Sequence, residues 1–264
     1  AGADLHAHAL VLDALAGGCD LFDIAQLERE NSPDEMAQLF RCMFIDDGMS
    51  VFQFALLQHC MVDSWVDWLD WKPFAQRPYG YKPVWLGYDP SNTGDSAALV
   101  VIAPPAVPGG KFRVLERHQF KGCDFADQAE KIREITTRYN VAYIGIDTTG
   151  LGAAVYQLVK QFYPAVEGLQ YSVELKNRMV LKMLDVMGNQ RLEFDAGWTE
   201  VSASFMAIKK TVTEKSKQPT YQAGRSEETS HADLAWAVMH AVQHEPLEGR
   251  TERNSSMRSE EHTS

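Results

Sequence analysis

The chain of 264 residues is 45% hydrophobic and 23% charged, which is ordinary for a globular protein able to bury a substantial core. It contains no apolar run of about 18 residues and no basic leader, so we expect neither a membrane span nor a signal peptide. The net charge of −11 is unfavourable for nucleic-acid binding, but residues 1–80 carry 13 acids and 4 bases, whereas residues 81–264 carry 23 acids and 21 bases.

The first 80 residues are predicted to form a helical arm. Ser32-Pro33-Asp34-Glu35 is a capping box with proline at the first helical position, and apolar residues follow it at helical spacing. Trp65, Trp68 and Leu69 indicate another short helix or a docking surface, and core packing is the simpler interpretation. Prolines and Gly80 make Lys72–Lys82 the predicted linker.

Strand patterns begin after the linker. Apolar runs predict strands at Val84–Tyr88, Ala97–Ile102 and Phe112–Phe120. Asp124 is predicted to cap a helix that ends near Tyr139, and Val141–Ile146 has the continuous apolar pattern of a central strand.

The second half is predicted to be mainly helical. Helices are expected from about Leu151, over 175–187, over 199–210 and over 230–244, with a strand near 166–170 and a polar β-ribbon over 211–225. A strand meander that leads into a strand–helix–strand unit predicts an α/β fold with a mixed sheet flanked by helices.

Two carboxylates follow predicted strands directly. Asp89 and Asp147 each come after an apolar strand and before a glycine-containing turn. If the strands are neighbours, both side chains lie at the sheet edge where open α/β sheets place their sites. Two carboxylates there repel each other, so a bound Mg²⁺ or Mn²⁺ is the natural compensation. The alternative is that each aspartate begins a turn or caps a helix.

Asp233 is the third candidate. It stands near the start of a predicted apolar helix, where Ser230 and Asp233 could equally form a capping arrangement that favours the helix dipole. The position of Asp233 relative to the sheet would decide between the two roles.

Three motifs in order resemble a known family. They are Gly87-Tyr88-Asp89-Pro90 with Gly94-Asp95, then Gly145-Ile146-Asp147-Thr148-Thr149-Gly150-Leu151-Gly152, and then His231-Ala232-Asp233 with Trp236-Ala237. Over about Val84 to Glu245 the chain resembles the ribonuclease-H-like nuclease domain of tailed-phage large terminase subunits. Residues 12–80 resemble the segment that joins the terminase ATPase to its nuclease.

The resemblance implies a two-metal-ion DNA endonuclease that cuts concatemeric double-stranded phage DNA during packaging. It assigns Asp89, Asp147 and Asp233 to catalysis and to two Mg²⁺ or Mn²⁺ ions, with Asp95 and His231 as accessory residues. It also implies the terminase small subunit and the portal or procapsid as partners, in the cytoplasm of the bacterial host.

DNA contacts are expected from bases that meet phosphates rather than base edges. Between Gln170 and Arg225 there are 9 bases and 6 acids, so a local basic patch is possible. The candidates are Lys176, Arg178, Lys209, Lys210, Lys215, Lys217 and Arg225. For each of them a solvated surface position is the alternative.

A phosphate-binding GxxxxGK[ST] loop is absent from the sequence, so ATP is expected to act only through a motor domain that this sequence lacks. We therefore predict three parts: a helical remnant over 1–80, the nuclease domain over 81–247 and a disordered tail over 248–264. Residues 258–264 resemble translated adapter sequence. The four cysteines show no CxxC pairing and are expected to be reduced.

Other hypotheses remain open. A resolvase or transposase would use a similar fold, although the terminase-like arm argues against it. An actin-like nucleotide-binding module could use Asp89–Gly94 as a phosphate loop, and a non-catalytic packaging or assembly module needs no metal. Metal-dependent plasmid nicking would separate a nuclease from the last two.

Overall fold

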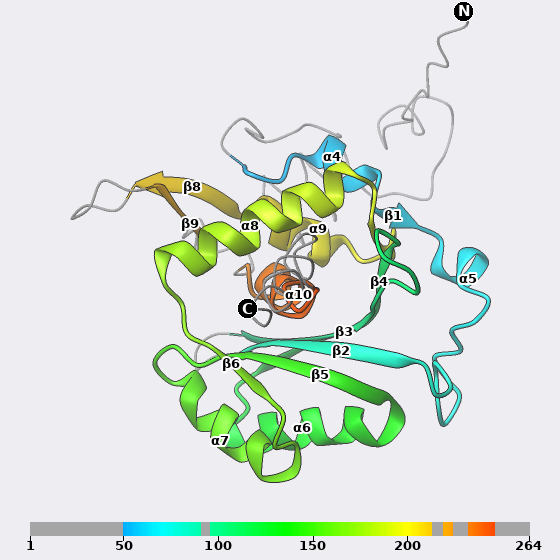
Figure 1. Ribbon diagram of the computed structural model, residues 1–264, viewed down its shortest axis with the longest axis vertical. Helices are drawn as coiled ribbons and strands as arrows, with labels where there is room; N and C mark the ends of the chain where they lie inside the picture. The colour runs from blue at the N-terminus through cyan, green and yellow to red at the C-terminus, as the bar shows by residue number, and fades with distance from the viewer. Residues whose placement is uncertain (1–49, 91–95, 213–218, 224–231, 246–264) are drawn as a thin grey trace, which may run out of the picture.

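The structure, a computed structural model, describes residues 50–90, 96–212, 219–223 and 232–245. Within these residues a mixed seven-stranded sheet has the order β1-β7-β4-β3-β2-β5-β6 (Figure 1). The strands are β1 (Met61–Val62), β2 (Pro83–Asp89), β3 (Ser96–Ala103), β4 (Phe112–Lys121), β5 (Asn140–Asp147), β6 (Glu167–Leu169) and β7 (Leu192–Asp195). The helix expected after Ser32 lies outside the described residues.

The centre of the sheet follows the predicted meander. β2 pairs antiparallel with β3, and β3 pairs antiparallel with β4. β2 also pairs parallel with β5, which pairs parallel with β6. Parallel pairing of β2 and β5 requires a crossover, and α6 (Phe125–Arg138) supplies it. Its predicted cap is confirmed, because the Asp124 side chain accepts a hydrogen bond from the Asp127 backbone N–H at 2.8 Å.

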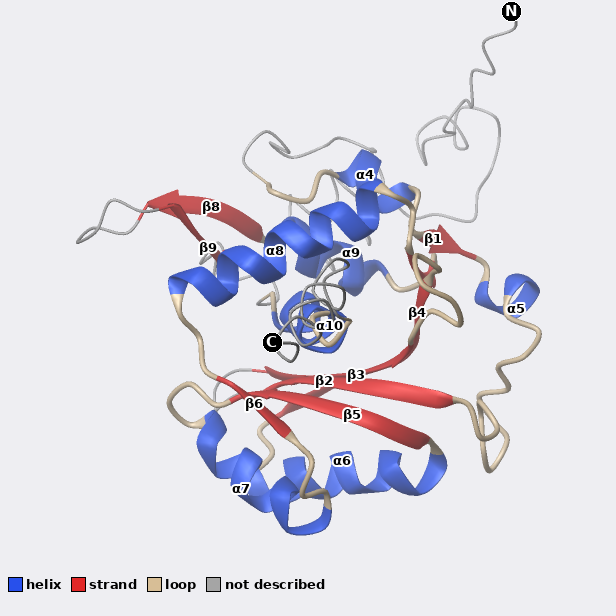
Figure 2. Ribbon diagram, viewed as in Figure 1, coloured by secondary structure: helices blue, strands red, loops and turns tan. Residues whose placement is uncertain are grey.

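Helices cover both faces of the sheet, as Figure 2 shows. α6 and α7 (Gly152–Phe162) lie on one face, and α8 (Val173–Gly188), α9 (Thr199–Met206) and α10 (Asp233–Val242) lie on the other. β3 contributes to the cores on both faces of the sheet. Leu99 and Val101 pack in the core under α6 and α7, whereas Val100 and Ile102 pack in the core under α8, α9 and α10. This double burial explains why β3 is a continuous apolar run.

α10 is buried on all sides. Every residue from Leu234 to Val242 is buried, including His240. A helix that is apolar all round belongs in a core, and α10 packs on β2 and β3 while also contacting α8 and α9. No helix among the described residues is both long and apolar enough to cross a bilayer.

Two predictions about the second half were wrong in detail. The helix predicted over 199–210 ends at Met206, because Ile208–Val212 forms strand β8 and pairs antiparallel with β9 (Pro219–Ala223). The predicted ribbon therefore exists but begins three residues earlier than expected. The short strands β1 and β7 were not predicted, since two and four residues are too few to show alternation.

The segment before β2 packs against the sheet. It contains α4 (Phe54–Gln58) and α5 (Ser64–Asp67), and β1 pairs parallel with β7. Trp68 is buried and its indole N–H donates to Glu193, so for this tryptophan the core-packing interpretation is correct. Trp65 and Phe74 are exposed and stack on each other with ring centroids 6.0 Å apart.

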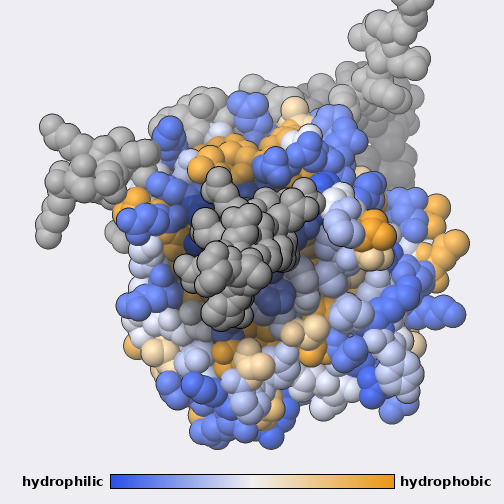
Figure 3. Space-filling view, viewed as in Figure 1, coloured by the Kyte–Doolittle hydropathy of each residue, from blue (hydrophilic) through white to orange (hydrophobic). Residues whose placement is uncertain are grey.

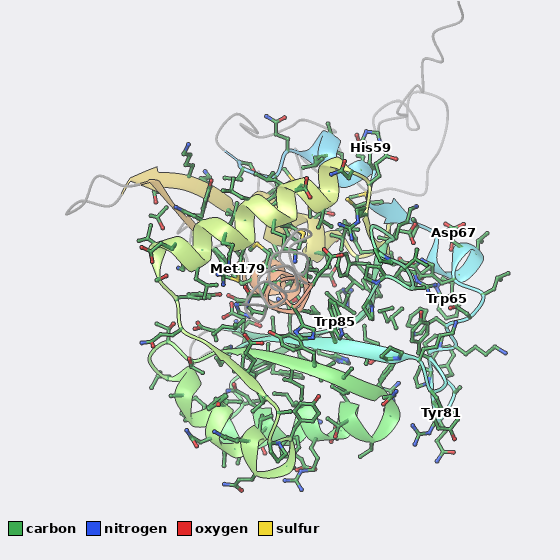
Figure 4. All side chains as sticks on the ribbon, viewed as in Figure 1. His59, Trp65, Asp67, Tyr81, Trp85 and Met179 are labelled. Atoms are coloured by element: carbon green, nitrogen blue, oxygen red, sulfur yellow. The ribbon has the colours of Figure 1, made fainter. Side chains whose placement is uncertain are left out.

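This exposed apolar surface lies at one edge of the molecule. Figure 3 shows hydrophobic side chains gathered over α5, and Figure 4 places Trp65 and Tyr81 at the same outer edge. Its largest members are Trp65, Val66, Leu69 and Phe74. The division of the chain into an arm and a nuclease domain at residue 80 stays a prediction.

Candidate functional site

Asp89 and Asp147 end two neighbouring parallel strands. In the register of β2 and β5, Gly87 lies beside Gly145 and Tyr88 lies beside Ile146. Each aspartate is the last residue of its strand. Both carboxylates are therefore carried at the same edge of the sheet, as the sequence predicted.

The glycines two residues earlier admit a helix that carries the third aspartate. A Cβ atom on Gly87 would lie 1.8 Å from the Ala237 carbonyl oxygen, and one on Gly145 would lie 3.0 Å from the His240 carbonyl oxygen. Only residues without side chains let the α10 backbone come this close to β2 and β5. Ala237 is one helical turn after Asp233, so this close packing brings the start of α10 to the carboxylate edge.

The N-terminus of α10 shows that Asp233 is not the N-cap residue of the helix. The N-cap residue is Ala232, which provides no side-chain hydrogen bond, and Asp233 stands in the first turn. The helix dipole stabilises its carboxylate there. The negative charge of Asp233 also raises the pKa of Asp89 across the site. Ser230, the other member of the expected capping arrangement, lies outside the described residues.

The carboxylates oppose one another electrostatically. Burial raises the pKa of Asp89 well above its ordinary value, and the charges of Asp233 and Asp147 raise it further. Burial also raises the pKa of Asp147, while hydrogen bonds from Thr149 oppose that rise. The Thr149 backbone N–H donates to Asp147 Oδ1 at 2.8 Å. We call Asp89, Asp147 and Asp233 the carboxylate site.

Lys176 supplies positive charge to the carboxylate site. It stands in the first turns of α8, and its charge lowers the pKa of both Asp89 and Asp147. Burial lowers the pKa of the Lys176 ammonium, and the two carboxylates partly offset that loss.

A buried hydrogen-bond chain supports β2 beside Asp89. The His240 Nδ1 atom is 3.1 Å from the Tyr88 carbonyl oxygen, which can only accept, so Nδ1 carries the proton. His240 Nε2 then accepts from the Tyr171 hydroxyl at 2.6 Å. Burial lowers the pKa of His240 to about 3, which keeps the ring neutral in this arrangement.

The donor chemistry of the carboxylate site fits a hard divalent cation. Carboxylate oxygens are the ligands that Mg²⁺ and Mn²⁺ prefer, and the charges of Asp233 and Asp147 raise the pKa of Asp89, as expected where acids outnumber bases. In the described part of the chain, no three histidine, cysteine, aspartate or glutamate side chains are grouped closely enough to hold an ion together. The donor set therefore suits a metal, while three-point coordination is not formed in this arrangement of side chains.

The other predicted residues are distributed more widely. Arg178 is on α8 and donates to Gln243, and Lys209 and Lys210 are on β8. β9, the partner of β8, contacts α8, and Figure 1 shows this hairpin projecting on the side of the molecule where α8 begins. The remaining candidates lie outside the described residues: Asp95, Lys215, Lys217, Arg225 and His231.

Sequence reasoning missed the supports of the carboxylate site. Tyr171 and His240 were not identified, because neither stands in a recognisable motif and they are 69 residues apart. A polar residue in the middle of the apolar run 234–242 was the available signal for His240, since a buried histidine needs partners.

Comparison with known proteins identifies the family. A family model described as the terminase RNase H-like domain matches residues 86–245. The chain belongs to this family. A second model, described as the N-terminal part of the T4-like large terminase subunit, matches residues 7–59.

Two curated terminase relatives are similar over most of the chain. The "Terminase, ATPase subunit" of Escherichia phage P2 is 60% identical over 89% of this chain, and the "Probable terminase, ATPase subunit" of Haemophilus phage HP1 is 41% identical over 89%. These matches span 40% and 39% of the two relatives, so the chain corresponds to less than half of their length.

Solved terminase structures share the fold. The magnesium-bound large terminase nuclease from thermophilic phage G20c aligns with a TM-score of 0.58 at 16% identity, covering 74% of this chain and 97% of that one. The large terminase of bacteriophage HK97 aligns with a TM-score of 0.52 at 12% identity, covering 73% of this chain and 43% of that one. These structures confirm the predicted ribonuclease-H-like fold, and the family model with the curated relatives confirms the predicted terminase family.

Proposed function

We propose that this part of the large terminase subunit is a metal-dependent endonuclease that cuts concatemeric double-stranded DNA during phage genome packaging. One observation carries the proposal: Asp89 and Asp147 end adjacent parallel strands beside the start of α10, where Asp233 adds a third negative charge. A structural role gives no reason to gather three carboxylates at this edge, where two of them raise the pKa of Asp89, whereas cation binding does.

The residues of the carboxylate site have a shared proposed task. Asp89, Asp147 and Asp233 would together hold the divalent metal. Bound metal would supply an activated water nucleophile and stabilise the leaving 3′ oxygen. The Thr149 backbone N–H orients the Asp147 carboxylate, and the chain from Tyr171 through His240 to the Tyr88 carbonyl fixes the backbone next to Asp89.

Related structures support a divalent ion at such a site. The nuclease from phage G20c has been solved with bound magnesium, cobalt and zinc. All three are divalent, and the oxygen donors here favour Mg²⁺ or Mn²⁺ over a metal that prefers sulfur.

DNA would be held through its phosphates. Arg178 on α8, with Lys209 and Lys210 on β8, would supply the positive charge that meets the phosphates. Such contacts fix the duplex without reading its sequence. Cleavage and DNA binding therefore depend on separate side chains.

The relatives support a proposal for the cellular setting. Both curated relatives are named as ATPase subunits, and this chain spans about 40% of their length, so we propose that ATP acts through a motor outside these 264 residues. The terminase small subunit and the portal or procapsid would be the partners, in the host cytoplasm.

Linearisation of supercoiled plasmid in Mg²⁺, Mn²⁺, Ca²⁺ or chelator tests the proposal. The wild-type chain should cut with Mg²⁺ or Mn²⁺, remain inactive in chelator, and bind DNA without cutting it in Ca²⁺, whose looser coordination positions the nucleophile poorly. Asp147→Asn should reduce cutting by orders of magnitude and leave DNA binding in place. Cleavage in chelator would contradict the metal mechanism, and absence of cleavage in every metal would favour the assembly-module alternative.

A further inference from the structure

Lys176 is held on two aromatic rings at the carboxylate site. Its Nζ atom lies 4.5 Å from the centroid of the Tyr171 ring and 5.2 Å from the centroid of the Trp236 ring. The two ring centroids are 5.5 Å apart. An ammonium over two ring faces is attracted by both, and more strongly where water is partly excluded. The position of the charge is therefore built into the fold.

The aromatic pair is tied to two of the carboxylate-bearing segments. Trp236 follows Asp233 by three residues on α10, so the two stand on neighbouring turns of one helix. The Tyr171 backbone N–H donates to Thr149 Oγ1 at 2.9 Å, two residues after Asp147. The ammonium thus lies against the same elements that carry the acids.

Lys176 interacts with Asp89 and Asp147 in both directions. Its positive charge attracts both carboxylates, and both carboxylates attract it. A phosphate contact on an open surface would not need this burial between aromatic rings and acids. The arrangement gives Lys176 a task at the carboxylate site itself.

We infer that Lys176 is a positioning cation that supplies part of the charge Asp89 and Asp147 require before a divalent ion enters, and that it thereby weakens the binding of that ion. The inference rests on the proposed function, because the same carboxylates must hold the metal. A fixed positive charge next to a divalent cation opposes its binding. Lys176 therefore sets the metal concentration at which the nuclease becomes loaded.

Calorimetric titration of Ca²⁺ into the metal-free chain without DNA tests this inference. Lys176→Met keeps the length of the side chain and removes its charge, so Ca²⁺ should bind tighter by roughly tenfold, the effect of removing one nearby unit charge in a partly solvated site. Lys176→Arg keeps the charge and should keep the wild-type affinity. Structural damage from either substitution would weaken binding, so the sign of the change separates the two explanations.

Lys160→Met is the matched control. Lys160 is a helical lysine whose Nζ lies 5.5 Å from the Tyr156 ring centroid, and it is exposed. Its loss changes net charge equally and should leave Ca²⁺ affinity unchanged. Unchanged or weaker Ca²⁺ binding by Lys176→Met would overturn the inference about the lysine. Loss of Ca²⁺ binding by Asp89→Asn in the same series would still support metal binding at the carboxylate site. Absence of Ca²⁺ binding by the wild-type chain would overturn both.

Discussion

Two clusters of charge in this molecule are built on opposite principles. At the carboxylate site, Asp89 lies among acids and its pKa is raised well above the ordinary value by burial and by the charges of Asp233 and Asp147. Beside β4, Asp70 has its pKa lowered, chiefly by hydrogen bonding to Arg113 and also by Lys82. The Arg113 guanidinium donates to both Asp70 oxygens, at 2.7 and 3.0 Å.

Glu116, on β4, shows the same balance as Asp70. Burial would raise its pKa, but hydrogen bonds from His118 and Tyr139 and the charge of Arg138 bring the pKa below its ordinary value. We call Asp70, Glu116 and their partners the ion-paired edge. Folding thus pairs acids with bases at the ion-paired edge. At the carboxylate site Lys176 only partly offsets the acids, which favours binding of a cation there.

The largest expected effect concerns the packing that builds the carboxylate site. Gly87→Ala places a methyl group 1.8 Å from the Ala237 carbonyl oxygen, where backbone atoms must move. Urea unfolding should show a loss of about 3 kcal/mol or more, with α10 displaced from β2. Gly188→Ala is the control, because its Cβ would meet nothing within 4 Å. The control should be neutral or more stable by up to about 1 kcal/mol. Equal stability of the Gly87 variant and the wild type would contradict the packing described for Gly87.

A smaller effect is expected at the ion-paired edge. Asp70→Asn removes a carboxylate paired with Arg113 and Lys82 at the protein surface, so unfolding at neutral pH should become easier by about 1 kcal/mol. Because the folded pKa is lowered, this stabilisation is full above the unfolded carboxyl pKa of about 4 and is lost as the pH falls below it. Urea midpoints of the variant and the wild type should therefore converge in acid.

Asp67→Asn provides the comparison for Asp70. Asp67 is exposed and three residues away, so Asp67→Asn should change the free energy of unfolding by less than about 0.5 kcal/mol at any pH. A midpoint difference for Asp70→Asn that persists in acid would mean that the carboxylate charge is not its source.

The smallest effect is predicted for the hydrogen-bond chain behind Asp89. Tyr171→Phe leaves His240 Nε2 without the hydroxyl at 2.6 Å and should cost about 1 kcal/mol or less. Because His240 also holds the Tyr88 carbonyl, plasmid cleavage should slow by a few fold as well. Tyr163→Phe removes a hydroxyl that donates to the Val141 carbonyl far from the site, and it should leave cleavage unchanged. Equal cleavage by both variants would show that the hydrogen bonds from Tyr171 through His240 to Tyr88 have no effect on cleavage.

The carboxylate site also shows which features could be predicted from the sequence and which could not. Asp89 and Asp147 were identifiable because an apolar strand, an aspartate and a glycine-containing turn are local patterns. Their adjacency followed from the order of the strands. The supports could not be predicted, since Tyr171 meets His240 only after α8 and α10 pack together.

Local pattern also failed where tertiary pairing decides the structure. β7 is four residues long and exists because β4 and β1 pair with it on either side. Residues 207–210 continue a helical pattern in sequence, yet Ile208 begins a strand because β9 lies beside it. For Trp68 core packing was expected, but its partner Glu193 is 125 residues away and no local pattern identifies it.

The most direct test of the account pairs one acid from each region. Asp89→Asn and Asp70→Asn make the same chemical change, and plasmid cleavage in Mn²⁺ is measured per folded molecule alongside urea unfolding. Asp89→Asn should lose cleavage by orders of magnitude, keep DNA binding and resist urea at least as well as wild type, since a repelled buried charge is gone. Asp70→Asn should unfold more easily and cut at the wild-type rate. Wild-type cleavage by Asp89→Asn would contradict the assignment of the carboxylate site as the nuclease centre.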